Sequence, residues 1–175
     1  IFGANKRSET FQTSSDRRRI EIKLKQFRSV PMLQFLDTAD KTAEEFPMGK
    51  LIDGLSIIPH CALNGDREHR LPGNVNFCFE GIEGESMLLL LDGKGICASS
   101  GSACTSGSLD PSHVLLAIGR PHEVAHGSLR LTLCESNTEA EIDHILACVP
   151  EIVAYLRGMS PVWRDLVEGK KSFIL

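Results

Sequence analysis

One cysteine, Cys104, lies in a segment that offers its side chain no apolar surroundings. The segment from Ser99 to Ser108 is built almost entirely of serine, glycine, alanine and threonine, which favour an exposed, flexible backbone. Cysteine is usually a small buried residue, and an exposed thiol is prone to oxidation. An exposed cysteine therefore needs a chemical reason, and the usual one is that its thiolate acts as a nucleophile. At Cys104 this role is as well supported as that of a buried structural residue. No lysine or arginine in the loop could activate the thiol. The pattern therefore favours a carrier arm over a fixed active site.

Arg130 is the second residue whose side chain could bind a substrate, because it is the one cation in the otherwise apolar and hydroxylic segment Ser128–Thr132. Alternation places its side chain opposite Leu129 and Leu131. One interpretation is an arginine on the solvent face of a strand. The other is carboxylate recognition, for which the planar guanidinium offers two parallel donors.

The histidines give only a weak indication of a metal site. His122 and His126 would share one face of a helix, but Gly119, Pro121 and Gly127 favour a turn-like segment. We therefore expect no metal site. The Ser99–Ser108 loop also lacks the lysine and the spacing of a phosphate-binding Walker A loop.

The composition limits the classes of protein to which the chain can belong. With 175 residues and 42% hydrophobic content, one modest domain is expected. The net charge of -4 argues against direct nucleic-acid binding, despite the local run Arg17–Arg19. No apolar run approaches a membrane span and no secretory signal is seen. The six cysteines have no paired short spacings, so we expect reduced thiols in the cytoplasm or an organellar matrix, with Cys61, Cys134 and Cys148 as small buried residues.

Apolar periodicity in the first half of the chain predicts both helices and strands. Between Leu36 and Ile57 a broken helical stripe is expected to form two short helices separated at Pro47. A short strand is expected at Cys61–Leu63. Strict alternation over Asn74–Glu80 predicts a half-buried strand with Val75, Phe77 and Phe79 on the core face and Cys78 opposite. A further short strand is expected over residues 95–98, leading into the cysteine loop.

The second half predicts a helix, a strand and a longer helix. Asp110-Pro111 is typical of a helix start, with the acid as cap and proline at the first helical position. Residues 128–134 alternate as a strand. Thr138 and Glu141 match a capping box that opens a helix reaching Leu156, with Pro150 inside it. These elements predict an α+β fold of helices packed on a small, mostly antiparallel sheet.

Several ordered motifs between about residue 49 and residue 156 resemble the NifS/IscS-type cysteine desulfurases of the class-V aminotransferase family. The resemblance rests on Ser99 to Leu109 (SSGSACTSGSL) and on five further motifs in the expected order: LNGD at 63–66, HRLPGNVN at 69–76, EGES at 83–86, PSHVL at 111–115 and AHGSLR at 125–130. Ordered motifs over such a length make chance agreement improbable.

The resemblance implies a pyridoxal-phosphate enzyme of the fold-type-I aminotransferase architecture that converts L-cysteine to L-alanine. It implies that Cys104 is the nucleophile and persulfide carrier, and that Arg130 pairs with the substrate carboxylate. Sulfur would then pass to an acceptor protein, such as an iron-sulfur scaffold or a tRNA-thiolation protein. Cys104 would also be the residue that transiently ligates an iron-sulfur cluster, if any residue does.

Departures from the family pattern limit what this chain is expected to do alone. The cofactor lysine and its companions belong to a preceding large domain that no segment here resembles, so the chain alone is not expected to bind pyridoxal phosphate. Its expected partners are that large domain and a second copy, since the family forms homodimers. We expect an unmatched, poorly ordered segment at 1–48, a small desulfurase domain at 49–157 and a tail at 158–175. Cys134 stands where the family usually has glycine. A cofactor-free persulfide relay is the alternative function.

Overall fold

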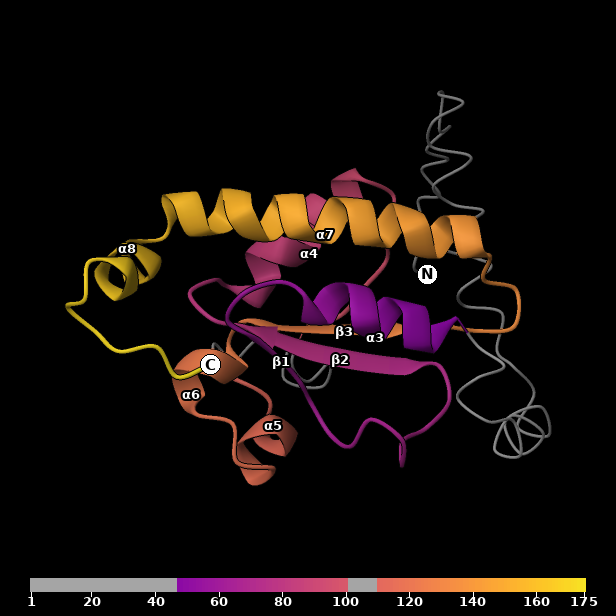
Figure 1. Cartoon of the computed structure of the whole chain (residues 1–175), viewed down its shortest axis with the longest axis horizontal. Coiled ribbons are helices and arrows are strands. Elements are labelled where there is room, and N and C mark those ends of the chain that lie inside the picture. The colour runs from indigo at the N-terminus through magenta and orange to yellow at the C-terminus, as the bar shows by residue number, and fades with distance from the viewer. Residues whose placement is uncertain (1–46, 101–109) are drawn as a thin grey trace, which may run out of the picture.

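The structure is a computed structural model that describes residues 47–100 and 110–175. The described elements are α3 (Met48–Ser56), β1 (Cys61–Leu63), β2 (Asn74–Phe79), α4 (Gly84–Gly93), α5 (His113–Ala117), α6 (His122–Ala125), β3 (Ser128–Thr132), α7 (Glu139–Met159) and α8 (Pro161–Val167). The strands form one antiparallel sheet in the order β1-β2-β3. Helices lie on both sides of it (Figure 1). The predicted α+β architecture, with helices on a small antiparallel sheet, is confirmed.

One face of the sheet carries the main core, and the alternation of β2 decides which face that is. Val75, Phe77 and Phe79 are each no more than 1% exposed, as predicted. Leu129 and Leu131 of β3 extend the same apolar face. Helices α3, α4 and α7 cover it, with α3 lying between α7 and the strands (Figure 1).

Helix α7 begins where the capping box predicts. The Thr138 hydroxyl accepts from the Glu141 amide, and the Glu141 carboxylate accepts from the Thr138 amide at 2.8 Å. Both bonds satisfy amides that the first turn of a helix leaves without partners. Pro150 is accommodated inside the helix, which continues to Met159. Among the described helices, none is by itself long and apolar enough to cross a membrane, and α7 and α8 reach that length only as a pair bent by 86°.

Pro47 stands immediately before α3, as the predicted break requires, and the first of the two expected helices falls outside the described residues. Other predicted boundaries were wrong. Residues 95–98 form no strand: the turn at Lys94 and Gly95 leads to a single bridge residue, Ser99. Helix α5 starts at His113 with Ser112 at its N-cap position, two residues after Pro111.

Two further predictions for the second half of the chain need correction. Strand β3 ends at Thr132 instead of residue 134, because the Cys134 amide turns to the Asn137 side chain. The segment predicted to be turn-like is the one-turn helix α6, so His122 and His126 do share a face, with ring centroids 4.6 Å apart.

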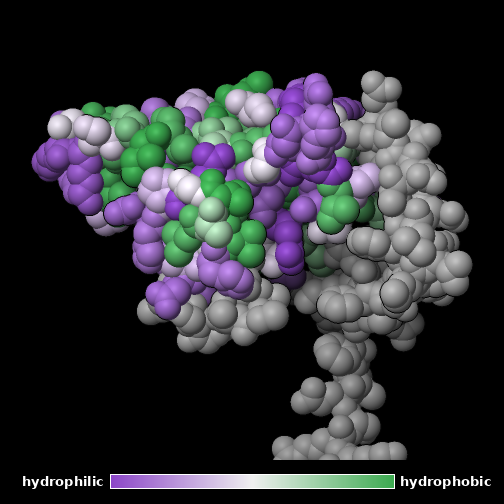
Figure 2. Space-filling model, turned by 90° about the horizontal axis from the view of Figure 1, so that it is seen from below, coloured by the Kyte–Doolittle hydropathy of each residue, from purple (hydrophilic) through white to green (hydrophobic). Residues whose placement is uncertain are grey.

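The second face of the sheet is covered by the short helices α5 and α6 (Figure 1). Cys78 lies on this face, as predicted, and is fully buried in a small apolar cluster with Leu115, Val124 and Ala125, against which Leu175 packs. Figure 2 views the molecule from this side and shows apolar areas separated by polar ones. The sheet therefore has a large core on one side and a smaller, partly polar layer on the other.

Candidate active site

Cys104 and residues 101–109 lie outside the described residues, so the site is built from the backbone that leads into this loop and from Arg130. Ser99 pairs with Arg130 through both backbone groups: the Arg130 amide donates to the Ser99 carbonyl at 2.7 Å, and the Ser99 amide donates to the Arg130 carbonyl at 3.0 Å. This bridge fixes the chain at the upstream end of the loop to the middle of β3.

Arg130 lies on the second face of the sheet and its side chain is exposed. Asn76 of β2 lies directly opposite it in the antiparallel register, and Ser99 lies opposite it on the other side. The Asn64 amide donates to the Asn76 carbonyl at 2.8 Å and so extends this row across the sheet. We call Asn64, Asn76, Arg130 and Ser99 the polar row. Residues directly opposite one another on antiparallel strands project from the same face.

Within the described part of the chain, the guanidinium of Arg130 forms no hydrogen bond and no ion pair. An exposed guanidinium that is not engaged by the described residues can bind an external carboxylate with two parallel donors.

A buried hydrogen-bond network holds the polar row in place. Asn64, which is 5% exposed, donates from Nδ2 to the Asn76 Oδ1 atom at 2.7 Å and to the Cys78 Sγ atom at 3.1 Å. Its Oδ1 atom accepts from Arg120 Nε at 2.6 Å, and Arg120 also donates to the Leu63 carbonyl at 2.6 Å. Arg120 lies between α5 and α6, so the network ties that connection to the sheet.

The same network shapes the chemistry of the Cys78 thiol. Burial raises the pKa of Cys78, and the Asn64 hydrogen bond and the charge of Arg120 oppose this increase only partly. A thiol kept protonated inside an apolar cluster is a poor nucleophile. Cys78 is thus a structural residue at this site.

The sequence patterns did not single out Asn64, Asn76 or Arg120. Asn64 entered only as one residue of the LNGD motif at 63–66, on which part of the family resemblance rests. Asn76 carried a usable signal, because the alternation of β2 places it on the face opposite the core. Arg120 had no local signal, since its partners lie 56 and 57 residues away in the chain.

Two glycines allow the chain segments around Arg130 to approach one another. A Cβ atom at Gly127 would collide with the Phe79 carbonyl, which lies beside the start of β3. A Cβ atom at Gly84 would lie 2.9 Å from Ser100 Cβ and 2.8 Å from the Ser128 carbonyl oxygen. The Phe79 and Ser128 carbonyls belong to the backbone and cannot easily yield, so glycine is required at both positions.

The described residues do not fit a cofactor that forms a Schiff base with a buried lysine. Lys50, Lys94, Lys170 and Lys171 are all exposed. Lys50 is engaged by Asp143 at 2.6 Å as well as by Glu139, and Lys170 by Glu168 at 2.6 Å. Within residues 47–100 and 110–175 there is also no group of three or more histidine, cysteine or acidic side chains suited to a metal ion.

Comparison with known proteins identifies the family of this chain. Residues 32–145 match the model of the aminotransferase class-V family. The chain belongs to that family. This class-V chain is 57% identical over 127 residues to "Cysteine desulfurase IscS" of Clostridium botulinum (strain Hall), covering 71% of the chain and 32% of that relative. It is 60% identical over 113 residues to "Cysteine desulfurase IscS" of Methanosarcina thermophila, covering 65% of the chain and 28% of the relative.

A solved structure described as a NifS-like protein has the same fold, with a TM-score of 0.55 and 32% identity. The match covers 65% of this class-V chain and 28% of the solved chain. The chain therefore spans about a third of the length of the relatives it matches. The resemblance to NifS/IscS-type desulfurases noted in the sequence is confirmed.

Proposed function

We propose that residues 49–157 of this class-V chain form the small domain of a cysteine desulfurase, in which Cys104 accepts sulfur from L-cysteine and Arg130 binds the substrate carboxylate. The observation that supports this most strongly is the exposed Arg130, joined by backbone hydrogen bonds to Ser99, the first residue of the cysteine loop. Identity of 57% to a named desulfurase supports the same chemistry.

The polar row gives Arg130 the surroundings that a carboxylate-binding residue needs. The backbone of β3 is held on one side by β2 and on the other by Ser99, so the start of the side chain is fixed. Asn76 is held in turn by buried Asn64. The backbone of Arg130 is thus held rigidly, and no described residue engages its guanidinium. Both features reduce the reorganisation needed when a carboxylate binds.

In this proposal the Cys104 thiolate attacks the sulfur atom of L-cysteine. A new S–S bond forms, the carbon–sulfur bond of the substrate breaks, and its electron pair remains on the substrate carbon. That carbon takes up one proton and leaves as L-alanine, while Cys104 retains the sulfur as a persulfide. The persulfide sulfur then passes to a thiol of an acceptor protein, such as an iron-sulfur scaffold or a tRNA-thiolation protein.

The family cofactor, pyridoxal phosphate, is bound outside the described residues in this proposal, because no described lysine is buried. The complete enzyme in this proposal therefore includes a cofactor-binding domain, and this chain alone is inactive in cysteine desulfuration. The resemblance to the family further implies that the complete enzyme is a homodimer. The chain's own contribution is the sulfur-accepting arm and the carboxylate-binding arginine.

The test uses the complete enzyme, in which this domain is joined to its cofactor-binding domain. Cys104→Ser should abolish persulfide formation and leave cofactor absorbance unchanged. Arg130→Ala should mainly raise KM for L-cysteine, by about tenfold to a hundredfold, because one charge-assisted carboxylate contact of about 1.5–3 kcal/mol is lost. Arg164→Ala, which removes an exposed arginine from α8, is the control and should leave both parameters unchanged.

Three results would contradict the proposal. Release of alanine at the normal rate by Cys104→Ser would exclude Cys104 as the nucleophile. An unchanged KM in Arg130→Ala would exclude carboxylate binding by Arg130. Persulfide transfer to Cys104 from a separate desulfurase, without any cofactor absorbance in the complete protein, would favour the cofactor-free relay.

A further inference from the structure

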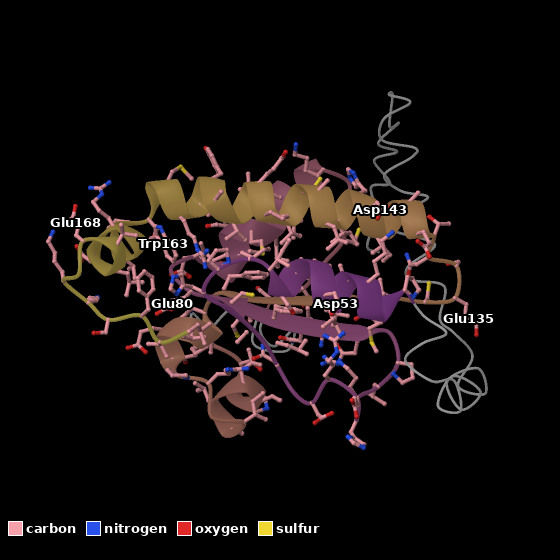
Figure 3. The ribbon with its side chains drawn as sticks, in the orientation of Figure 1. Asp53, Glu80, Glu135, Asp143, Trp163 and Glu168 are labelled. Carbon is pink, nitrogen blue, oxygen red and sulfur yellow. The ribbon has the colours of Figure 1, made fainter. Side chains whose placement is uncertain are left out.

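A second built site lies at the end of β2, where the chain's last described residues return to the sheet. We call it the notch and define it by His60, Glu80, Trp163 and the Cys78 cluster. Glu80 and Trp163 lie together at the end of the molecule that carries α8 (Figure 3). The notch holds the segment Phe173–Leu175, which has no regular secondary structure.

The notch recognises the backbone of this segment through a buried acid. Glu80 is 4% exposed, and its two carboxylate oxygens accept from two consecutive amides, Ile174 at 2.9 Å and Leu175 at 3.1 Å. No other described residue donates to this carboxylate. A buried carboxylate is costly without such donors, so Glu80 requires two neighbouring peptide N–H groups from whatever occupies the notch.

Side-chain contacts add a sequence preference to this backbone recognition. The Phe173 ring stacks on His60 with centroids 3.8 Å apart, and Trp163 closes the aromatic group at 5.4 Å from Phe173. The Leu175 side chain packs against the Cys78 cluster, and its carbonyl oxygen lies 2.7 Å from His60 Nδ1. Ile174 projects outward and is 49% exposed. The pattern is an aromatic residue, a free position and an aliphatic residue.

The notch walls are fixed independently of the segment they hold. Arg157 lies over Trp163 at 3.9 Å and donates to the carbonyls of Pro59, His60 and Glu80. His60 keeps a left-handed backbone, with φ of 52°, that is unusual for a residue other than glycine. Rigid walls, paired acceptors for consecutive amides and alternating side-chain pockets are the features by which proteins bind extended peptides.

We infer that the notch is a peptide-binding site, occupied by the chain's own residues 173–175, and that a separate peptide with the pattern aromatic–any–aliphatic binds there when this segment is removed. The site takes extended segments that present two consecutive free N–H groups. It is independent of Cys104 and Arg130, so its failure would leave the desulfurase proposal untouched.

The experiment uses the chain ending at residue 172 and a synthetic peptide Lys-Ser-Phe-Ile-Leu. Two reporters lie at the site: Trp163, the one tryptophan among the 175 residues, and the thiol of Cys78, which is 0% exposed in the occupied structure. Removing residues 173–175 should shift the Trp163 emission and speed alkylation of Cys78, measured by peptide mass mapping. Adding the peptide should reverse both changes with the same saturation curve.

The matched control is the same peptide methylated on the isoleucine and leucine nitrogens, which keeps every side chain and removes both donors to Glu80. It should bind at least tenfold more weakly, as should the unmodified peptide to a Glu80→Gln receptor, because each loses charge-assisted hydrogen bonds. Equal binding of the methylated peptide would overturn the inference. So would the absence of binding to a receptor whose circular dichroism shows it to be folded.

A measurement on the full chain decides the matter if the shortened chain does not fold. Hydrogen exchange at the Ile174 and Leu175 amides should be slowed in the unaltered chain and at least tenfold faster in Glu80→Gln. Exchange at the rate of an unstructured peptide in the unaltered chain would overturn the inference.

Discussion

Replacing Arg157 with methionine, a side chain of similar length, should lower the free energy of unfolding by about 3–5 kcal/mol. Arg157 is 7% exposed and donates to three backbone carbonyls, those of Pro59 and His60 at 2.8 Å and that of Glu80 at 3.1 Å. Three charge-assisted bonds would contribute about 4.5–9 kcal/mol if each reached its full net value.

Two effects reduce that sum. Burial lowers the pKa of the Arg157 guanidinium, which shows that keeping this charge in place has a cost that methionine does not carry. Pro59 is exposed, so water can reach the neighbourhood of its carbonyl once the guanidinium is gone. A third effect acts in the opposite direction: the contact of Arg157 with the face of Trp163 at 3.9 Å is lost, which adds roughly 1–2 kcal/mol to the destabilisation.

Urea unfolding followed by circular dichroism measures the effect. With a slope of about 1–3 kcal/mol per molar urea, the midpoint should fall by roughly 2 M without a change in slope. Arg130→Met is the matched control, because the same substitution at an exposed strand position should change stability by no more than about 0.5 kcal/mol. A loss below about 1 kcal/mol at Arg157, or equal losses at both arginines, would refute this account of the buried guanidinium.

Three further predictions concern single positions, each measured by the same unfolding assay. Gly127→Ala should destabilise the fold by more than about 3 kcal/mol, because its Cβ would collide with a backbone carbonyl, whereas Gly158→Ala, with open space around it in α7, should stabilise by roughly 0.5 kcal/mol. Thr138→Ala should lower the free energy of unfolding by about 1 kcal/mol, because the capping box is lost. Thr138→Ser keeps the hydroxyl and should retain most of that stabilisation. Burial raises the pKa of Cys78, so the folded state holds a thiol proton that the unfolded state releases above about pH 8.5. The free energy of unfolding should therefore fall as the pH rises above that value, and it should fall less steeply in Cys78→Ala.

The sequence predicted best those elements whose signals are local. Alternation over residues 74–80 identified β2 and the three side chains of its core face, because a strand's period fixes the face of each residue. The pair Thr138 and Glu141 located the start of α7, since both bonds of a capping box lie within one turn.

Local sequence patterns failed where contacts with a segment distant in the chain decide the burial of a residue or the formation of a strand. Cys78 was correctly placed opposite the main core, but only the structure shows it fully buried, because α5, α6 and Leu175 form a second layer over that face. Residues 95–98 looked like a strand and yet lack one, since Ser99 alone reaches β3. Cys104 was singled out by its loop composition and lies outside the described residues, so its role stays a proposal.

The two arginines show why a candidate site can be predicted more readily than the scaffold that supports it. Arg130 was conspicuous because it is the one cation in the otherwise apolar and hydroxylic strand β3, and the chemistry proposed for it needs only an exposed guanidinium on a fixed strand. Arg157 lies in the last turn of α7, where a basic residue is common because it favours the negative end of the helix dipole. Its importance comes from three carbonyls 77 to 98 residues away in the chain, which no local pattern encodes. Those bonds position the backbone of Glu80 and His60, and with them the notch that receives Phe173–Leu175.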